Sequence, residues 1–245
     1  MNTKSLPAPA DASPRRLSGA VTLHVAAVVV AVFGGVMNGR FETVAGGLSL
    51  GVAVLLFIPA ALAALPLVLP DRLRVPVALA NAVVVTGFVV LTFGGVGAFF
   101  APLALQLWAA VLVPWLVSRG FDLSEHPVWR VFGAVTVALP GLLLFAGMLS
   151  GSLGWTPAGV AIAAALVALA LGFALGHRRA APVIAVLGVA LLVVAFFDPG
   201  MLMAGVWWVG GYYLSFGLGS TVAWTGAAKR TGPSAHPRTA DTLEG

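Results

Sequence analysis

The chain has 245 residues, of which 60% are hydrophobic and 9% are charged, and its formal net charge is +5. Soluble domains carry about 25% charged residues, so this composition argues against a water-soluble domain and is typical of an integral membrane protein. The sequence contains no cysteine, which excludes disulfides, thiolate metal ligands and thiol redox chemistry of its own.

The first 17 residues are rich in Pro, Ala and Ser, and we expect them to form a disordered cytoplasmic arm. Eight apolar stretches follow, and none has an Asp, Glu, Lys or Arg in its central part. About 20 apolar residues cross a bilayer as a helix, because only a helix satisfies its own backbone hydrogen bonds there. We therefore predict an all-α bundle of about eight transmembrane helices within residues 18–224, at 18–37, 48–69, 76–95, 98–117, 128–150, 157–175, 181–197 and 201–224.

The distribution of positive charge predicts the orientation of these helices. With a cytoplasmic amino terminus, only Arg40 lies outside, and twelve basic residues lie inside: Lys4, Arg15, Arg16, Arg72, Arg74, Arg119, Arg130, Arg178, Arg179, Lys229, Arg230 and Arg238. Such a bias places both termini in the cytoplasm of a cell-membrane protein, with residues 225–245 as a disordered cytoplasmic tail. The positive charge flanks the apolar stretches, so it indicates the membrane topology of the chain and not a surface that binds nucleic acid. We therefore expect the lipid bilayer as partner and no nucleic acid.

Short recurrences point to an internal repeat. The tetrapeptide Gly-Ala-Val-Thr occurs at 19–22 in the first stretch and at 133–136 in the fifth, and 51–54 resembles 159–162. Pro-Val opens the third stretch at 76–77 and the seventh at 182–183. A duplication would give two parallel four-helix halves, a plan used by transporters. Chance recurrence in a chain rich in Gly, Ala and Val is the alternative.

Polar side chains within the spans are the candidates for lining a solute site. His24 and Asn81 are expected at a similar depth near the inner side, and Gln106 lies nearer the middle of its span. The last span adds Tyr212 and Ser215. These side chains either line a cavity, or each bonds a neighbouring helix and holds the bundle together. Without a carboxylate at its depth, His24 is expected to be neutral at pH 7.

The last span also carries Gly211, Ser215 and Gly219 at a spacing of four residues. Small residues on one face let another backbone approach closely, so this stripe predicts a seam with another helix, another membrane subunit or a second copy of the chain. A ligand groove floored by glycine is the alternative.

The external charges are Arg40 and Glu42, expected in the loop after the first span, and Asp198 in the turn before the last. They form either an external polar site or a solvated loop and a turn. No Lys lies within a span, only one His does, and neither a zinc-protease motif nor a phosphate loop occurs. We therefore assign no catalytic residue, metal or cofactor.

Three hypotheses about function remain. The first is a transport-related permease or permease-like component that handles a neutral or hydrophobic solute. The second is an integral membrane enzyme that acts on a lipid or isoprenoid through Glu42, Asp198 or His24. The third is a non-catalytic membrane scaffold, assembly or immunity factor. The scarcity of ionisable groups within the spans argues against pumps and proton relays, and the first is our working hypothesis.

Overall fold

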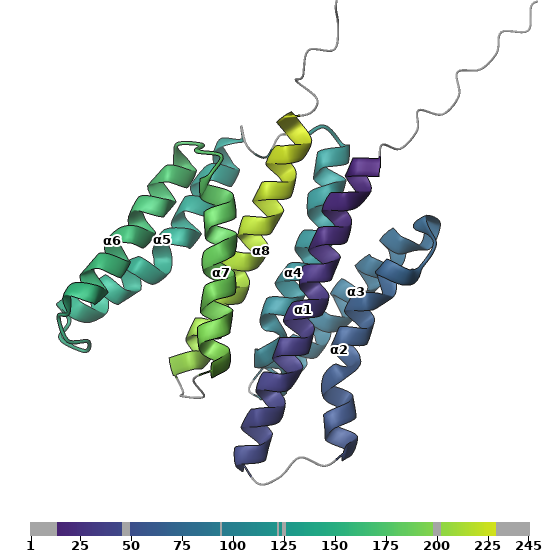
Figure 1. The fold of residues 1–245 in the computed structure, drawn as a ribbon, viewed down its shortest axis with the longest axis horizontal. Coiled ribbons are helices and arrows are strands. Elements are labelled where there is room, and N and C mark those ends of the chain that lie inside the picture. The colour runs from purple at the N-terminus through teal and green to yellow at the C-terminus, as the bar shows by residue number, and fades with distance from the viewer. Residues whose placement is uncertain are drawn as a thin grey trace, which may run out of the picture. The chain divides into compact units, whose positions relative to one another are not determined.

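The computed structural model describes residues 14–45, 50–93, 95–121, 123, 126–197 and 202–228. Every helix or strand in these ranges is an α-helix, which confirms the predicted all-α class (Figure 1). The eight helices are α1 (Pro14–Ala45), α2 (Leu50–Val68), α3 (Asp71–Leu91), α4 (Val96–Ser118), α5 (Pro127–Leu149), α6 (Pro157–Ala174), α7 (Ala180–Phe197) and α8 (Leu202–Ala228).

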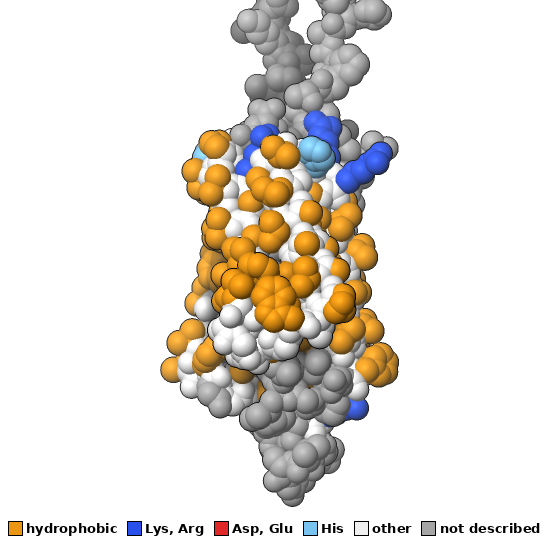
Figure 2. Space-filling view, turned by 90° about the vertical axis from the view of Figure 1, so that its left-hand side faces the viewer, with side chains coloured by type: hydrophobic (Ala, Val, Ile, Leu, Met, Phe, Trp, Pro, Cys, Tyr) orange, Lys and Arg blue, Asp and Glu red, His pale blue; other side chains and the backbone are white. Residues whose placement is uncertain are grey.

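Six of these helices contain described segments that are long and apolar enough to cross a membrane: Gly19–Arg40, Asp71–Leu91, Val96–Ser118, Pro127–Leu149, Pro157–Ala174 and Ala180–Phe197. An apolar helix belongs either in the core of a large protein or in a membrane. In α6 only 17% of the apolar segment is buried, so its apolar side chains face outward. On the face in Figure 2, hydrophobic side chains cover the middle and basic side chains lie at the ends. The chain is therefore a multi-pass membrane protein by the length and hydropathy of its helices.

Two helices do not meet the same criterion within the described residues. In α2 the apolar segment is the shorter Leu56–Val68. In α8 the polar side chains include Tyr212, Tyr213 and Ser215, and most residues from 207 to 224 are buried. A helix enclosed by other helices needs less apolar character than one that faces lipid. The predicted helix count of eight is thus confirmed, whereas eight membrane spans remain a prediction.

The chain divides into two compact units, which we call unit 1 (Met1–Pro114) and unit 2 (Trp115–Gly245). In unit 1, α1 contacts α2, and α2 contacts α3. Two adjacent glycines bring α1 close to two partners: a Cβ added to Gly35 would lie 2.9 Å from the Leu56 carbonyl oxygen of α2, and one on Gly34 would lie 3.0 Å from the Phe99 oxygen of α4. Both helices therefore approach α1 at backbone distance.

In unit 2, α5 contacts α6 and α8, α7 contacts α6, and α7 and α8 form the most extensive pair. A Cβ added to Gly210 of α8 would lie 2.9 Å from the Leu192 nitrogen of α7, and one on Gly217 would lie 2.8 Å from the Ala181 oxygen. The seam between α7 and α8 thus uses Gly210 and Gly217, which lie about 150° around the helix from the predicted stripe. The stripe of Gly211, Ser215 and Gly219 stays a prediction.

The first helix is longer than the predicted span. It begins at Pro14, so residues 14–17 are helical and do not belong to the expected arm, and it ends at Ala45. Arg40 and the backbone of Glu42 therefore lie in α1, and the prediction of a loop at these positions is wrong. The apolar segment ends at Arg40, and the helix runs on to Ala45 because residues 41–45 contain neither glycine nor proline.

Candidate functional site

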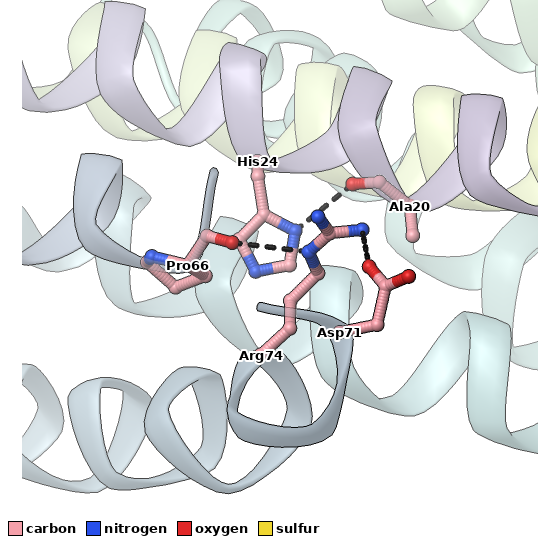
Figure 3. Close-up of polar contacts among 5 residues, drawn as sticks. All are labelled: Ala20, His24, Pro66, Asp71 and Arg74. Carbon is pink, nitrogen blue, oxygen red and sulfur yellow. Dashed lines mark hydrogen bonds and ion pairs between the residues drawn. The ribbon is translucent and has the colours of Figure 1, made fainter. Parts of the chain in front are cut away.

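His24 lies on α1 in unit 1 and is only 3% exposed. Its Nδ1 is 2.9 Å from the carbonyl oxygen of Ala20 in the preceding turn (Figure 3). Because a carbonyl oxygen can only accept, Nδ1 must carry the proton, and Nε2 of the neutral ring is then an acceptor. This Nε2 is buried and has no hydrogen-bond partner in the described structure.

Arg74 of α3 points toward His24 from the opposite side and interacts with it electrostatically (Figure 3). The Arg74 side chain forms an ion pair of 3.0 Å with Asp71, and its Nε donates to the Pro66 oxygen of α2 at 3.1 Å. The residue four positions after Pro66 is Pro70, which has no N–H to offer that oxygen. A positive charge, partly neutralised by Asp71, thus stands beside His24.

Asn81 of α3 donates from Nδ2 to the Leu62 oxygen of α2 at 2.6 Å. In a regular helix that oxygen would accept from the N–H of residue 66, but residue 66 is proline. Asn81 therefore satisfies a carbonyl that the proline has freed, and its amide nitrogen holds α2 and α3 together.

Gln106 of α4 is fully buried, and its Nε2 donates to the Leu23 oxygen of α1 at 3.1 Å. Since the Leu23 oxygen can only accept, the amide nitrogen must face it, which fixes the orientation of the side chain. The other amide atom, Oε1, is buried and finds no hydrogen-bond partner among the described residues. Leu23 immediately precedes His24, so the Gln106 amide and the imidazole lie at the same level of α1.

Asn38, which the sequence placed just after the first span, lies in α1 and is 1% exposed. Both amide atoms of Asn38 are buried without a hydrogen-bond partner in the part of the chain described. Asn38 lies about four turns beyond His24 and within about 40° of the same helix face. Ala31, between them on this face, is fully buried. The helical spacing of His24 and Asn38 could have shown that they share a face of α1. Because the predicted first span ends at residue 37, Asn38 was instead expected in the following loop.

In unit 2 the predicted candidates form mostly local contacts. Ser215 donates to the Gly211 oxygen of its own helix at 2.8 Å. Tyr212 lies beside Thr136, but its buried hydroxyl has no hydrogen-bond partner within the described residues. The neighbouring Tyr213, which the sequence analysis did not single out, donates to the Val137 oxygen of α5 at 2.6 Å.

The sequence candidates therefore divide between the units. His24, Asn81 and Gln106 lie in unit 1, with one free acceptor atom on each of His24 and Gln106, while Tyr212 and Ser215 lie in unit 2. Of the external candidates, Arg40 is exposed at the end of α1. The Glu42 side chain and Asp198 lie outside the described residues. Among the residues that are described, no group of three His, Asp or Glu side chains could hold a metal ion.

Comparison with protein-family models, with curated proteins and with solved structures finds no match to this chain.

Proposed function

We propose that this multi-pass membrane protein is a transport-related permease or permease-like component, and that the interior of unit 1 forms the path of a small neutral solute. The observation that carries the proposal is that four of the eight buried polar atoms that lack partners within the described residues lie on α1 and α4 of unit 1: Nε2 of His24, Oε1 of Gln106, and Nδ2 and Oδ1 of Asn38. The other four belong to Trp129, Tyr212, Ser220 and Trp224 in unit 2.

Such atoms are costly in a membrane protein. A buried polar group without a partner costs about 1–3 kcal/mol, and a bundle that serves only as a scaffold gains nothing from it. A solute that hydrogen-bonds these atoms as it passes recovers this cost. His24 and Asn38 stand about four turns apart on one face of α1, with the small Ala31 between them. Polar groups at two depths are what a path with more than one binding position needs.

A second observation supports the two-half plan of a transporter. The Gln106 amide of the fourth helix donates to the carbonyl of Leu23, which directly follows the first Gly-Ala-Val-Thr. The Tyr213 hydroxyl of the eighth helix donates to the carbonyl of Val137, which directly follows the second. Corresponding helices of the two halves are thus joined at corresponding residues, as a duplication would produce.

The test measures glycerol entry into phosphatidylcholine vesicles that contain the purified protein, from the light scattering of vesicles that shrink and then swell. We expect faster swelling than in protein-free vesicles. Asn38→Leu removes two unpartnered polar atoms, so it should leave the melting temperature unchanged or raise it. It should nevertheless slow protein-dependent glycerol entry about tenfold, as the loss of a hydrogen bond of about 1.4 kcal/mol would.

The matched control is Val32→Leu, which alters an exposed side chain of the same helix. Its glycerol entry should stay within about twofold of the parent protein, because outward-facing substitutions change free energies by about 0.5 kcal/mol or less. Swelling no faster than in protein-free vesicles would contradict the proposed path and favour the scaffold hypothesis.

A further inference from the structure

The turn between α6 and α7 concentrates positive charge at one end of unit 2. It carries His177, Arg178 and Arg179, and all three side chains are exposed. The side chains of Arg178 and Arg179 form no hydrogen bond or ion pair with any residue that the structure describes. Neither α6 nor α7 contains an Asp or Glu. Within this helix pair, nothing therefore neutralises the two arginines.

A third arginine, Arg130 of α5, lies against the same turn. A Cβ added to Gly176 would lie 3.1 Å from Cζ of Arg130 and 3.3 Å from each of its two terminal nitrogens. The terminal nitrogens are no nearer than Cζ, so the guanidinium presents its flat face to Gly176. Arg178 and Arg179 follow Gly176 by two and three residues, which is at most about 11 Å of extended chain. Arginines from α5 and from the turn thus lie close together in the unit.

Exposed apolar side chains flank this basic turn. Leu171 and Leu175 near the end of α6 are 59% and 73% exposed, and Val183 and Val186 near the start of α7 are 49% and 68% exposed. Figure 2 shows this order on one face of the molecule, where hydrophobic side chains cover the middle and basic and histidine side chains lie at the end. Exposed apolar surface of a membrane helix faces acyl chains. The turn therefore lies at the level of lipid headgroups, next to a surface for acyl chains.

We propose that the turn between α6 and α7 binds an anionic phospholipid, with its phosphate on Arg178 and Arg179 and its acyl chains along the exposed leucines and valines. Guanidinium groups donate two parallel hydrogen bonds to a phosphate, which suits them to this headgroup. A zwitterionic lipid also carries an ammonium group, which the arginines repel, whereas a lipid with net negative charge is attracted by each of them. A soluble phosphate would use only the charge, whereas a phospholipid also covers the apolar side chains. This lipid site does not depend on the solute path in unit 1.

The test is native mass spectrometry of the full-length protein in detergent, mixed with equal amounts of phosphatidylglycerol and phosphatidylcholine that carry the same acyl chains. We expect about ten times more bound phosphatidylglycerol than phosphatidylcholine. Arg178→Gln and Arg179→Gln together should reduce this preference to about twofold or less. Arg178→Lys and Arg179→Lys together keep the charge and should retain most of the preference. Because both positions are exposed, the melting temperatures of these variants should match that of the parent protein.

The matched control removes the same charge elsewhere. Arg72→Gln together with Arg119→Gln alters two exposed arginines at the ends of α3 and α4, and the preference for phosphatidylglycerol should stay within about twofold of that of the parent protein. An equal loss in the two Gln double variants would show general charge attraction and overturn the site, and so would equal binding of the two lipids by the parent protein. Glycerol 3-phosphate has the phosphate without acyl chains, so an excess of it should displace no lipid. Displacement would identify a site for soluble phosphates and contradict a lipid site.

Discussion

Individual residues of α3 satisfy carbonyl groups that prolines leave open in α2. Pro66 removes the donor for the Leu62 oxygen, which Asn81 binds, and Pro70 removes the donor for the Pro66 oxygen, which Arg74 binds. Where water is absent, a carbonyl oxygen that lacks a backbone donor has no other hydrogen-bond partner. The side chains of Asn81 and Arg74 supply that partner at the carbonyls that the prolines leave open. Prolines near the end of α2 thus mark carbonyls that side chains of α3 bind.

This pairing predicts a specific coupling between Asn81 and Pro66. Asn81→Leu should lower the free energy of unfolding by about 1 kcal/mol, because the Leu62 oxygen loses its partner. In a Pro66→Ala background most of this cost should disappear, since the N–H of residue 66 then serves the same oxygen. Unfolding of all four proteins in detergent gives the coupling energy. Equal costs of Asn81→Leu in both backgrounds would show that Asn81 acts in another way.

Two adjacent tyrosines of α8 give a second residue-level prediction. Tyr213→Phe removes a hydrogen bond of 2.6 Å to the Val137 oxygen and should cost about 0.5–1.5 kcal/mol of stability. Tyr212→Phe removes a buried hydroxyl that lies beside Thr136 without forming a hydrogen bond of ordinary geometry, so it should cost less stability than Tyr213→Phe. Melting temperatures in one detergent compare the two variants, and a larger loss for Tyr212→Phe would contradict these roles.

Sequence reasoning identified the polar residues better than their partners. His24, Asn81 and Gln106 stand out because each interrupts an apolar helix. Asn81 and Gln106 donate to backbone carbonyls of other helices, and His24 donates to one of its own helix. Such carbonyls leave no mark in the sequence unless a proline shows which carbonyl is free, as Pro66 does for Leu62. Asn38 was misplaced because the predicted first span ends at residue 37, whereas the apolar segment of α1 runs to Arg40.

Among the elements, α7 and α8 form a seam in which glycine is sterically required. A Cβ on Gly188 of α7 would meet the backbone nitrogen of Leu214 in α8, with the Gly210 oxygen 2.7 Å away. Both neighbours are backbone atoms and cannot rotate aside, so a methyl group must push the helices apart.

We therefore expect Gly188→Ala to destabilise the protein by about 1–3 kcal/mol through overpacking. The matched control is Gly172→Ala in α6, where an added Cβ would meet no atom within 4 Å. There alanine should leave stability unchanged or raise it by up to about 1 kcal/mol through helix propensity. The readout is thermal unfolding in detergent, and equal melting temperatures for the two variants would exclude a tight seam at Gly188.

The spacing of small residues predicted close packing of α8 on the face of Gly211, Ser215 and Gly219, whereas the seam with α7 uses Gly210 and Gly217. Gly210, Gly211, Gly217 and Gly219 all lie within three turns, and several stripes can be drawn through them. Only the position of α7 selects Gly210 and Gly217. In α6 the stripe of Ala164, Ala168 and Gly172 faces outward, so a similar pattern marks no seam within that unit.

At the scale of the whole molecule, the all-α class and the eight helices could be predicted because each helix corresponds to an apolar stretch of the sequence. A helix enclosed by other helices needs less apolar character than one that faces lipid. The boundary between the two units, at Pro114 and Trp115, falls in the last turns of α4. The internal repeat stays a prediction. The orientation in the membrane depends on charge alone and remains a prediction.

This orientation can be tested with reporters. Because twelve of the thirteen Lys and Arg residues fall on one predicted side, a reporter fused after Gly245 should be active in the cytoplasm, and one inserted at Gly154 should be active outside. Protease protection of the same fusions in sealed cells provides the control. An external carboxyl terminus would contradict the eight-span topology.

The central claim is that the interior of unit 1 is reached by water and small solutes, and cysteine accessibility tests it most directly because the chain has no cysteine of its own. Ala31→Cys places a thiol on the buried face between His24 and Asn38, and Val32→Cys places one on the adjacent exposed apolar face. Reaction with a charged methanethiosulfonate needs water, since the thiolate is the reactive form. We predict that Cys at position 31 reacts in vesicles and Cys at position 32 does not; an unreactive thiol at position 31 would contradict a solute path through unit 1.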